Sequence, residues 1–294
     1  MAENSAGEKC SAEAAVEGSD FSERMISYSQ NSEDVLLRRL YPEKTDGYYI
    51  DVGAHHPLHD SVTRYFYDRG WHGINIEPIP DMYQRLSQER TRDINLNVGL
   101  SNSDGISIFY ESVTHPALST FVEANTQHHI EQGEKFRERT VPLTTLAKIC
   151  AEHAVSKIDF LSIDVEGFER QVLEGADFER WRPRAILIES TYPNSRRPTH
   201  RLWEDLLLNA DYSFAFFDGL NRFYVRSEDA SLCERLAVPA NVFDNFIPYR
   251  YYSWSRELEV HRKEIQVHRE NWRAIGRLSR AWRAFRAPLP ETRD

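Results

Sequence analysis

The stretch YYIDVGA, residues 48–54, decides the fold, because it is a short apolar run that shows no alternation and ends in a carboxylate and a glycine. Such runs are typical of parallel strands that are buried on both faces of a sheet. A helical pattern follows over residues 61–69, and a second strand, GINIEP at residues 73–78, precedes another helix that ends near Ser87. This alternation predicts right-handed crossovers and a parallel sheet covered by helices on both faces.

Later stretches continue the alternation. DINLNVGLS (93–101) predicts a third strand, and GISIFYE (105–111) has the period of two that favours an antiparallel return strand. IDFLSIDVEG (158–167) and AILIES (185–190) predict two more parallel strands, and Asp218-Gly219 marks a closing hairpin. A sheet of this kind binds its ligand beyond the carboxyl ends of its strands, where the strand order reverses.

Composition divides the chain into three parts. Residues 1–24 are rich in Ala, Glu, Ser and Gly and are predicted to be disordered. Residues 25–228 form the predicted α/β domain, with a polar insertion at about 112–140 that we interpret as a lid. Residues 229–294 hold an aromatic-rich loop and a basic amphipathic helix from about 255 to 285. We expect this helix to dock on its own core or on a second copy. A short coiled coil, or a contact with an anionic membrane or a glycan-assembly partner, is the alternative.

The totals exclude several classes of protein. The length of 294 residues suits one sizeable α/β domain with tails, and the net charge of −10 argues against a nucleic-acid partner. The three cysteines, Cys10, Cys150 and Cys233, have neither disulfide-framework nor zinc-site spacing. No apolar run approaches the roughly 20 residues of a transmembrane segment, and no secretory signal is visible. We therefore expect a cytoplasmic protein.

Polar residues stand at the ends of the first three predicted strands. Asp51 precedes Gly53, and a glycine there permits a close backbone approach or an unusual φ angle. Glu77 comes one strand–helix–strand step later, where an acid can accept hydrogen bonds from both hydroxyls of a ribose. Asn97 can meet a purine edge or satisfy its own turn. The glycines of the dinucleotide fingerprint G-x-G-x-x-G are incomplete here.

Carboxylates also end the fourth and fifth strands. Asp164 and Glu166 follow a hydrophobic strand, and buried acids are costly unless they are paired or used. Asp164 is a candidate general base, metal ligand or substrate orienter, and Glu166 a candidate helix cap or substrate ligand. Glu189 ends the neighbouring strand, so that Asp164 and Glu189 together are a candidate Mg²⁺ site.

Two histidines, His55 and His56, follow the first strand. At least one is a candidate proton acceptor, and a surface or capping role is expected for the other. The G-x-S-x-G elbow of many hydrolases is absent.

These motifs, in this order, resemble the FkbM-type methyltransferases, a branch of the class I S-adenosylmethionine-dependent enzymes. The resemblance covers about residues 26–226. It is carried by YSQNSED (28–34), IDVGAHHP (50–57), INIEP (74–78), NVGLS (97–101), LST (118–120), DFLSIDVEGFE (159–169) and GLNRFYV (219–225). It implies a Rossmann-like sheet of seven strands and S-adenosylmethionine as cofactor.

The resemblance also implies roles for single residues. Asp51 and Gly53 would line the methionine part of the cofactor, Glu77 would hold the ribose, and residues 97–100 would border the adenine. Asp164 would lie near the transferred methyl group. The cofactor-binding residues expected in full are Gln30, Asp51, Gly53, Ala54, Glu77, Pro78, Asn97, Val98, Gly99, Leu100 and Asp164, and the catalytic candidates are Asp164, Glu166, His55 and His56.

Methyl transfer to a hydroxyl oxygen is the activity that the resemblance implies. The expected acceptor is a small molecule or glycan, a saccharide or glycosylated metabolite, which suggests polysaccharide biosynthesis. Sugar hydroxyls are poor nucleophiles and need a base, a metal such as Mg²⁺, or both. Two alternatives are another nucleotide-binding Rossmann enzyme and an inactive scaffold that works through its C-terminal helix.

Overall fold

The computed structural model describes residues 24–285, without the side chains of residues 128, 276 and 278–285. Almost all of the predicted disordered tail, residues 1–24, therefore lies outside the described residues. The chain forms two compact units, of which Ile26–Ser253 holds the sheet and the second includes the helical segment from Trp254 onwards. Among the described residues, no helix is long and apolar enough to cross a membrane.

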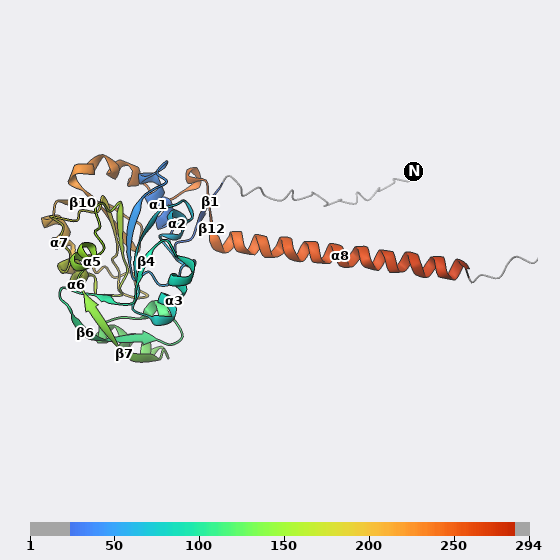
Figure 1. Ribbon diagram of the computed structural model, residues 1–294, viewed down its shortest axis with the longest axis horizontal. Helices are drawn as coiled ribbons and strands as arrows, with labels where there is room; N and C mark the ends of the chain where they lie inside the picture. The colour runs from blue at the N-terminus through green and yellow to red at the C-terminus, as the bar shows by residue number, and fades with distance from the viewer. Residues whose placement is uncertain (1–23, 286–294) are drawn as a thin grey trace, which may run out of the picture. The chain divides into compact units, whose positions relative to one another are not determined.

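A seven-stranded sheet organises the larger unit (Figure 1). All of its strands run parallel except β11, which pairs antiparallel with both of its neighbours. The order across the sheet is β10 (Tyr212–Phe217), β11 (Asn221–Arg226), β9 (Ala185–Glu189), β8 (Phe160–Ile163), β2 (Tyr48–Val52), β3 (His72–Ile76) and β4 (Ile94–Leu96). The chain moves outward from β2 to β4 and then returns to β8 on the other side of β2. The strand order therefore reverses between β2 and β8, and the predicted Rossmann-like sheet is confirmed.

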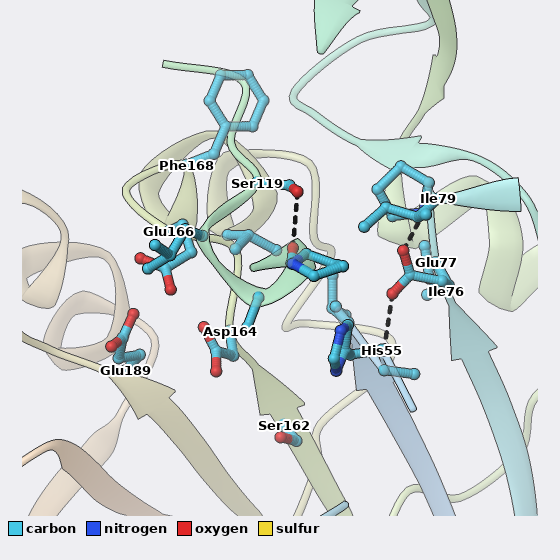
Figure 2. A pocket seen from close by; sticks show the side chains of 18 of the residues that line it. His55, Ile76, Glu77, Ile79, Ser119, Ser162, Asp164, Glu166, Phe168 and Glu189 are labelled. Atoms are coloured by element: carbon cyan, nitrogen blue, oxygen red, sulfur yellow. Dashed lines mark hydrogen bonds between the residues drawn. The ribbon is translucent and has the colours of Figure 1, made fainter. Parts of the chain in front are cut away.

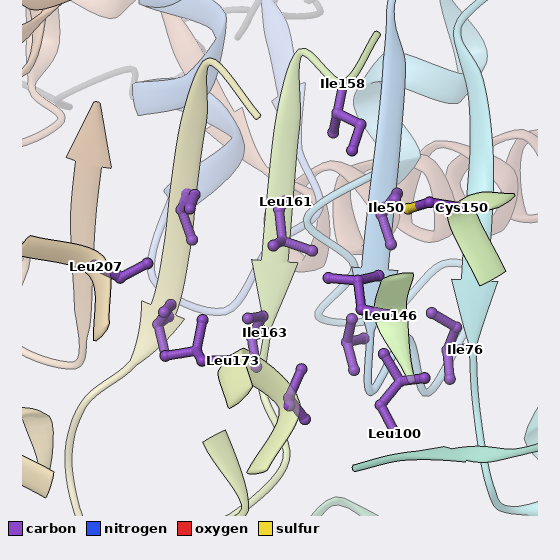
Figure 3. Packing of buried hydrophobic residues seen from close by; sticks show 14 of the residues in the cluster. Ile50, Ile76, Leu100, Leu146, Cys150, Ile158, Leu161, Ile163, Leu173 and Leu207 are labelled. Atoms are coloured by element: carbon purple, nitrogen blue, oxygen red, sulfur yellow. The ribbon is translucent and has the colours of Figure 1, made fainter. Parts of the chain in front are cut away.

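Alternate residues of the central strands pack into two different layers. One face is aliphatic, where Ile50, Leu161 and Ile186 meet the helices α5 (Leu146–Glu152), α6 (Glu169–Glu174) and α7 (Glu204–Asn209) in a single cluster (Figure 3). The other face is aromatic, where Tyr49 and Phe160 stack with their ring centroids 5.7 Å apart. Both layers exclude water. Helices this short are marginally stable by themselves, so the packing of their apolar faces against the sheet stabilises them.

Eight α-helices and four 3₁₀ segments are found in the described part of the chain. The α-helices are α1 (Glu33–Leu40), α2 (Arg64–Asp68), α3 (Pro80–Glu89), α4 (Glu123–Glu131), α5 (Leu146–Glu152), α6 (Glu169–Glu174), α7 (Glu204–Asn209) and α8 (Tyr249–Phe285). The 3₁₀ segments are η1 (Pro116–Leu118), η2 (His200–Leu202), η3 (Ser227–Leu236) and η4 (Val242–Asp244). The helix α8 begins earlier than residue 255, where the sequence predicted its start.

A second sheet departs from the prediction. The single strand expected over residues 93–101 is two strands, because β4 ends at Leu96 and β5 (Gly99–Leu100) joins a different sheet. In that sheet β7 (Phe136–Thr144) lies between β5 and β6 (Gly105–Ser112), and β6 and β7 are antiparallel along their whole length. The return strand was therefore predicted correctly, but its partner is β7, which begins within the insertion and continues beyond it. The remaining strands, β1 (Met25–Ser27) and β12 (Phe246–Pro248), pair with each other.

Candidate functional site

A cavity of about 310 Å³ opens at the carboxyl ends of β2, β3, β8 and β9, beside the point where the strand order reverses. Most of the residues predicted for the site lie around it. The predicted residues that line the cavity are Gln30, Asp51, Gly53, Ala54, His55, Glu77, Pro78, Val98, Gly99, Leu100, Asp164, Glu166 and Glu189. His56 and Asn97 are absent from the lining.

Gly53 sits where β2 and β8 approach most closely. Its φ angle is +84°, and a Cβ atom placed on it would lie 1.8 Å from the carbonyl oxygen of Asp164. The amide of Asp164 donates a hydrogen bond of 2.9 Å to the carbonyl of Val52, which ties the two strand ends together. Only glycine fits this position, because any larger residue would meet the backbone of the neighbouring strand.

Glu77 forms one wall of the cavity from the end of β3. Its two carboxylate oxygens accept hydrogen bonds of 2.7 Å from the backbone amides of His55 and Ile79 (Figure 2). Burial raises the pKa of Glu77 to about 7, although the two amide donors oppose the shift. Each oxygen keeps a lone pair, so the ionised side chain can still accept two further hydrogen bonds, as from the adjacent hydroxyls of a ribose.

Asn97 stabilises the backbone of the wall that Glu77 forms. Its side-chain amide donates to the carbonyls of Glu77, at 2.8 Å, and of Pro78, at 3.1 Å. The side chain is thus used to hold the end of β3. Between the two roles that the sequence left open, the structure places Asn97 in the one that satisfies backbone groups of a turn.

Asp51 lies on the floor of the cavity and is almost fully buried. One of its oxygens accepts a hydrogen bond of 3.0 Å from the hydroxyl of Thr63. Burial raises the pKa of Asp51 to about 6, and hydrogen bonds from Thr63 and Ser162 oppose the shift. The carboxylate is therefore held rigidly at the end of β2, where it presents negative charge to the cavity.

Three carboxylates gather on the opposite side of the cavity from Glu77 (Figure 2). Asp164, Glu166 and Glu189 each place an oxygen within 4.8 Å of the others. Asp164 faces the cavity and is open to solvent there, but protein surrounds it on the other sides, and burial raises its pKa to about 6. Burial, and then the negative charge of Asp164, raise the pKa of Glu166 and of Glu189 well above the usual range.

Two observations make this acidic group unusual. Glu189 is only 8% exposed, and its side chain has another acid, Asp164, as its hydrogen-bonding partner. The Oε2 atom of Glu166 is buried and has no hydrogen-bond partner among the described residues. Buried charges are normally paired or bound to a cation. The group therefore has an unmet requirement for a proton, a donor or a metal ion.

The insertion holds Glu166 in position. Glu166 has a φ angle of +52°, and its carbonyl accepts hydrogen bonds of 2.8 Å from Thr120 Oγ1 and from Asn125 Nδ2. Gly167 follows with a φ angle of +101°. Both donors come from the segment that the sequence indicated as a lid, so this segment is attached directly to the acidic turn.

The two histidines lie in different environments. His55 lines the cavity, its Nε2 atom is buried without a partner among the described residues, and burial lowers its pKa. His56 turns away, and its Nδ1 atom accepts hydrogen bonds from the amides of Leu58, at 3.0 Å, and His59, at 3.1 Å. Burial lowers the pKa of His56 to about 4. His55 thus lies beside the cavity as a neutral imidazole, whereas His56 stabilises a turn.

Sequence reasoning missed the apolar wall of the cavity. It is formed by Ile79, Phe109 and Phe121, and the two phenyl rings lie 4.7 Å apart. Phe109 belongs to the strand that alternates with period two, which indicated an inward-facing residue but not what it would face. Phe168, directly after the acidic turn, also lines the cavity. An apolar wall in the same cavity as Glu77 suits contact with a planar ring.

Three solved structures match this chain at low identity and low TM-score. A TehB-like S-adenosylmethionine-dependent methyltransferase from Corynebacterium glutamicum has 9% identity and a TM-score of 0.35, over 65% of this chain and 87% of that one. A precorrin-6y C5,15-methyltransferase from Geobacter metallireducens has 12% identity and a TM-score of 0.34, over 69% and 93%. An O-methyltransferase from Bacillus cereus, in complex with SAH, has 12% identity and a TM-score of 0.33, over 68% and 82%.

The family is shown by sequence. No curated protein matches the chain. The family model described as "Methyltransferase FkbM domain" matches residues 51–214, a range that begins at Asp51 and contains Glu77, the acidic group and the whole insertion. The chain therefore belongs to the FkbM methyltransferase domain family.

Proposed function

We propose that this protein transfers a methyl group from S-adenosylmethionine to a hydroxyl oxygen of a saccharide or a glycosylated metabolite. The family supports the methyltransferase part of this proposal. The acceptor and the oxygen specificity rest on the chemistry of the cavity, above all on the three carboxylates that gather beside the point where the strand order reverses.

The cavity residues fit the proposed cofactor. Glu77 retains lone pairs for two hydroxyls, and the apolar wall of Ile79, Phe109 and Phe121 offers a surface on which a purine can pack. Bound S-adenosylmethionine supplies an electrophilic methyl group on a positively charged sulfonium. The negative charge of Asp51 and Asp164, at the ends of adjacent strands β2 and β8, favours that positive charge. Gln30, Val98, Gly99 and Leu100 complete the proposed cofactor site.

The acidic group supports oxygen as the methyl acceptor. A sugar hydroxyl keeps its proton at neutral pH, so the transfer needs a group that takes the proton as the oxygen attacks. Asp164 faces the cavity, and His55, a neutral imidazole whose buried Nε2 atom has no partner among the described residues, lines the same cavity. Thr191, Asn194 and Ser195, which follow β9, add polar groups that suit the hydroxyls of a saccharide.

A divalent cation is the second part of the proposal. Asp164, Glu166 and Glu189 offer three oxygen ligands, and the buried, unpartnered Oε2 atom of Glu166 lies within this group. Mg²⁺ and Mn²⁺ prefer such ligands. A bound cation would offset the repulsion among the carboxylates and lower the pKa of an acceptor hydroxyl.

Calorimetric titration with S-adenosylmethionine tests the cofactor, and it is repeated with EDTA and with Mg²⁺. Glu77→Ala should abolish binding, whereas Asp164→Asn, which removes one of the two charges proposed to face the sulfonium, should only weaken it. Asp60→Asn is the matched control, because Asp60 lines the same cavity outside the acidic group. Normal binding by Glu77→Ala would overturn the assignment of the cofactor site.

Two further measurements test the acceptor and the cation. Incubation with methyl-labelled S-adenosylmethionine and a panel of saccharides, followed by NMR, should find the label on oxygen, and label on nitrogen or carbon would refute the proposal. Mn²⁺ should raise the unfolding temperature of the wild type and of Asp60→Asn, but not that of Glu189→Gln. An equal shift in all three proteins would exclude the cation site.

A further inference from the structure

The helix α8 carries an apolar stripe that the proposed methyl transfer does not use. Leu258, Ile265, Trp272 and Ile275 are all more than half exposed, and Trp272 is 73% exposed. A helix with a large exposed stripe loses the free energy that burial would supply, and long helices in water gain most of their stability from packing. The stripe therefore indicates a partner surface.

The spacing of the stripe is that of a coiled coil. Leu258, Ile265 and Trp272 are seven residues apart, and positions 261, 268 and 275 lie between and after them at alternating steps of three and four. In the heptad notation abcdefg, the first set occupies the a positions. The d positions are held by His261, His268 and Ile275. The two histidines interrupt the apolar residues of the d positions. The seven-residue spacing of the a positions nevertheless continues without a break from Leu258 to Trp272.

The charged residues beside the stripe favour a second α8 helix as the partner, in the parallel orientation. Glu257 and Glu264 occupy g positions, and Arg262 and Arg269 occupy the e positions that follow them by five residues. In a parallel, in-register pair, each g residue lies beside the e residue of the next heptad of the other helix. Two of these contacts then pair Glu with Arg, at 257–262 and at 264–269, whereas the third heptad places Asn271 beside Gly276. In an antiparallel pair, g meets g and e meets e, so that like charges would oppose each other.

We propose that α8 forms a parallel, in-register coiled coil with α8 of a second copy of this chain. Two Glu–Arg pairs on each side of the stripe are complementary between copies: Glu257 with Arg262, and Glu264 with Arg269. The two histidine layers weaken this coiled coil, because an imidazole at a d position buries less apolar surface than leucine and must keep its polar atoms satisfied. The dimer is therefore reversible and specific in register.

Charge reversal in the full-length protein tests the proposal. In Glu257→Arg/Glu264→Arg, all four of these g and e side chains are positively charged. In Arg262→Glu/Arg269→Glu, all four are negatively charged. By analytical ultracentrifugation each variant alone should be monomeric, and an equimolar mixture should form a heterodimer. Arg256→Glu/Lys263→Glu is the control, because it changes charge equally at f positions, which face away from the stripe. This control should dimerise like the wild type.

Two variants test the direction and the histidine layers. Leu258→Cys should form much more disulfide-linked dimer on oxidation than the wild type, whose own cysteines give the background, because a parallel, in-register pair places residue 258 beside its copy. His261→Leu/His268→Leu should tighten the dimer by more than about tenfold. The proposal would be overturned if both the wild type and His261→Leu/His268→Leu were monomeric by analytical ultracentrifugation. Binding of monomeric protein to phosphatidylserine vesicles that is lost in Leu258→Glu/Ile265→Glu would also overturn it, since the stripe would then be a membrane surface.

Discussion

Replacing Gly53 by alanine should damage both the fold and the cofactor site, by an amount that the structure allows us to estimate. The new Cβ atom would have to move from 1.8 Å to at least 3.0 Å from the carbonyl oxygen of Asp164. That movement separates β2 from β8 and breaks the hydrogen bond of 2.9 Å between Asp164 and Val52. Positive-φ strain costs about 1–2 kcal/mol and the lost hydrogen bond about 1 kcal/mol, so the free energy of unfolding should fall by about 2–3 kcal/mol.

Gly219 provides the matched control for this substitution. Its φ angle is +106°, in the turn between β10 and β11 of the same sheet, and a Cβ atom there would meet nothing within 4 Å. Gly219→Ala should therefore cost only the strain, about 1–2 kcal/mol. Urea unfolding measures both costs, and calorimetry should show at least a roughly tenfold loss of S-adenosylmethionine affinity in Gly53→Ala alone, because a displacement of this size removes a positioned contact. Equal unfolding costs in the two variants would refute the close-approach argument.

Three other outcomes are expected. Affinity for S-adenosylmethionine should fall as the pH drops from 8 to 6, because protonation of Glu77, whose pKa is about 7, removes an acceptor of the ribose hydroxyls. Calorimetry measures this affinity, and a value that stayed constant over this range would contradict the role of Glu77. Burial raises the pKa of Glu33 to about 7 against 4.5 in the unfolded chain, so the folded state binds the extra proton between these values and gains stability as the pH falls through them. Glu33→Gln should therefore be more stable than the wild type at pH 8, by at most roughly 3 kcal/mol, and should lose that advantage towards pH 5, as thermal unfolding would measure. Thr120→Val removes one donor to the carbonyl of Glu166 and should lower kcat while leaving cofactor affinity unchanged; unchanged kcat would remove the insertion from a positioning role.

The positions of the acids were predictable because parallel strands end at one edge of a sheet. Asp51, Glu77, Asp164 and Glu189 each follow an apolar run, so the alternation of strands and helices was enough to bring them together around one cavity. Their roles in binding and catalysis remain proposals. What the pattern determined was a place in the sheet, and no more than that.

Other features depended on interactions between distant segments. The expected third strand breaks at Asn97, whose side chain bonds to Glu77 and Pro78 across the sheet, and no local pattern records such a partner. His55 and His56 are adjacent in sequence, yet the φ angle of +48° at His55 sends them to different surroundings. The contact between the insertion and Glu166 joins residues that are 46 positions apart in the chain.

The contact between the insertion and Glu166 shows that two separate parts of the chain form the cavity. The proposed cofactor residues stand on the ends of the central strands, whereas the roof of the cavity, from Pro116 to Phe121, belongs to a segment fastened to the acidic turn by two hydrogen bonds to one carbonyl. Backbone carbonyls are present whatever the side chain, so another insertion with two donors could be fastened in the same way. Exchange of this segment would then alter the part of the cavity that adjoins the acidic turn, while the sheet and the residues at its strand ends stayed unaltered.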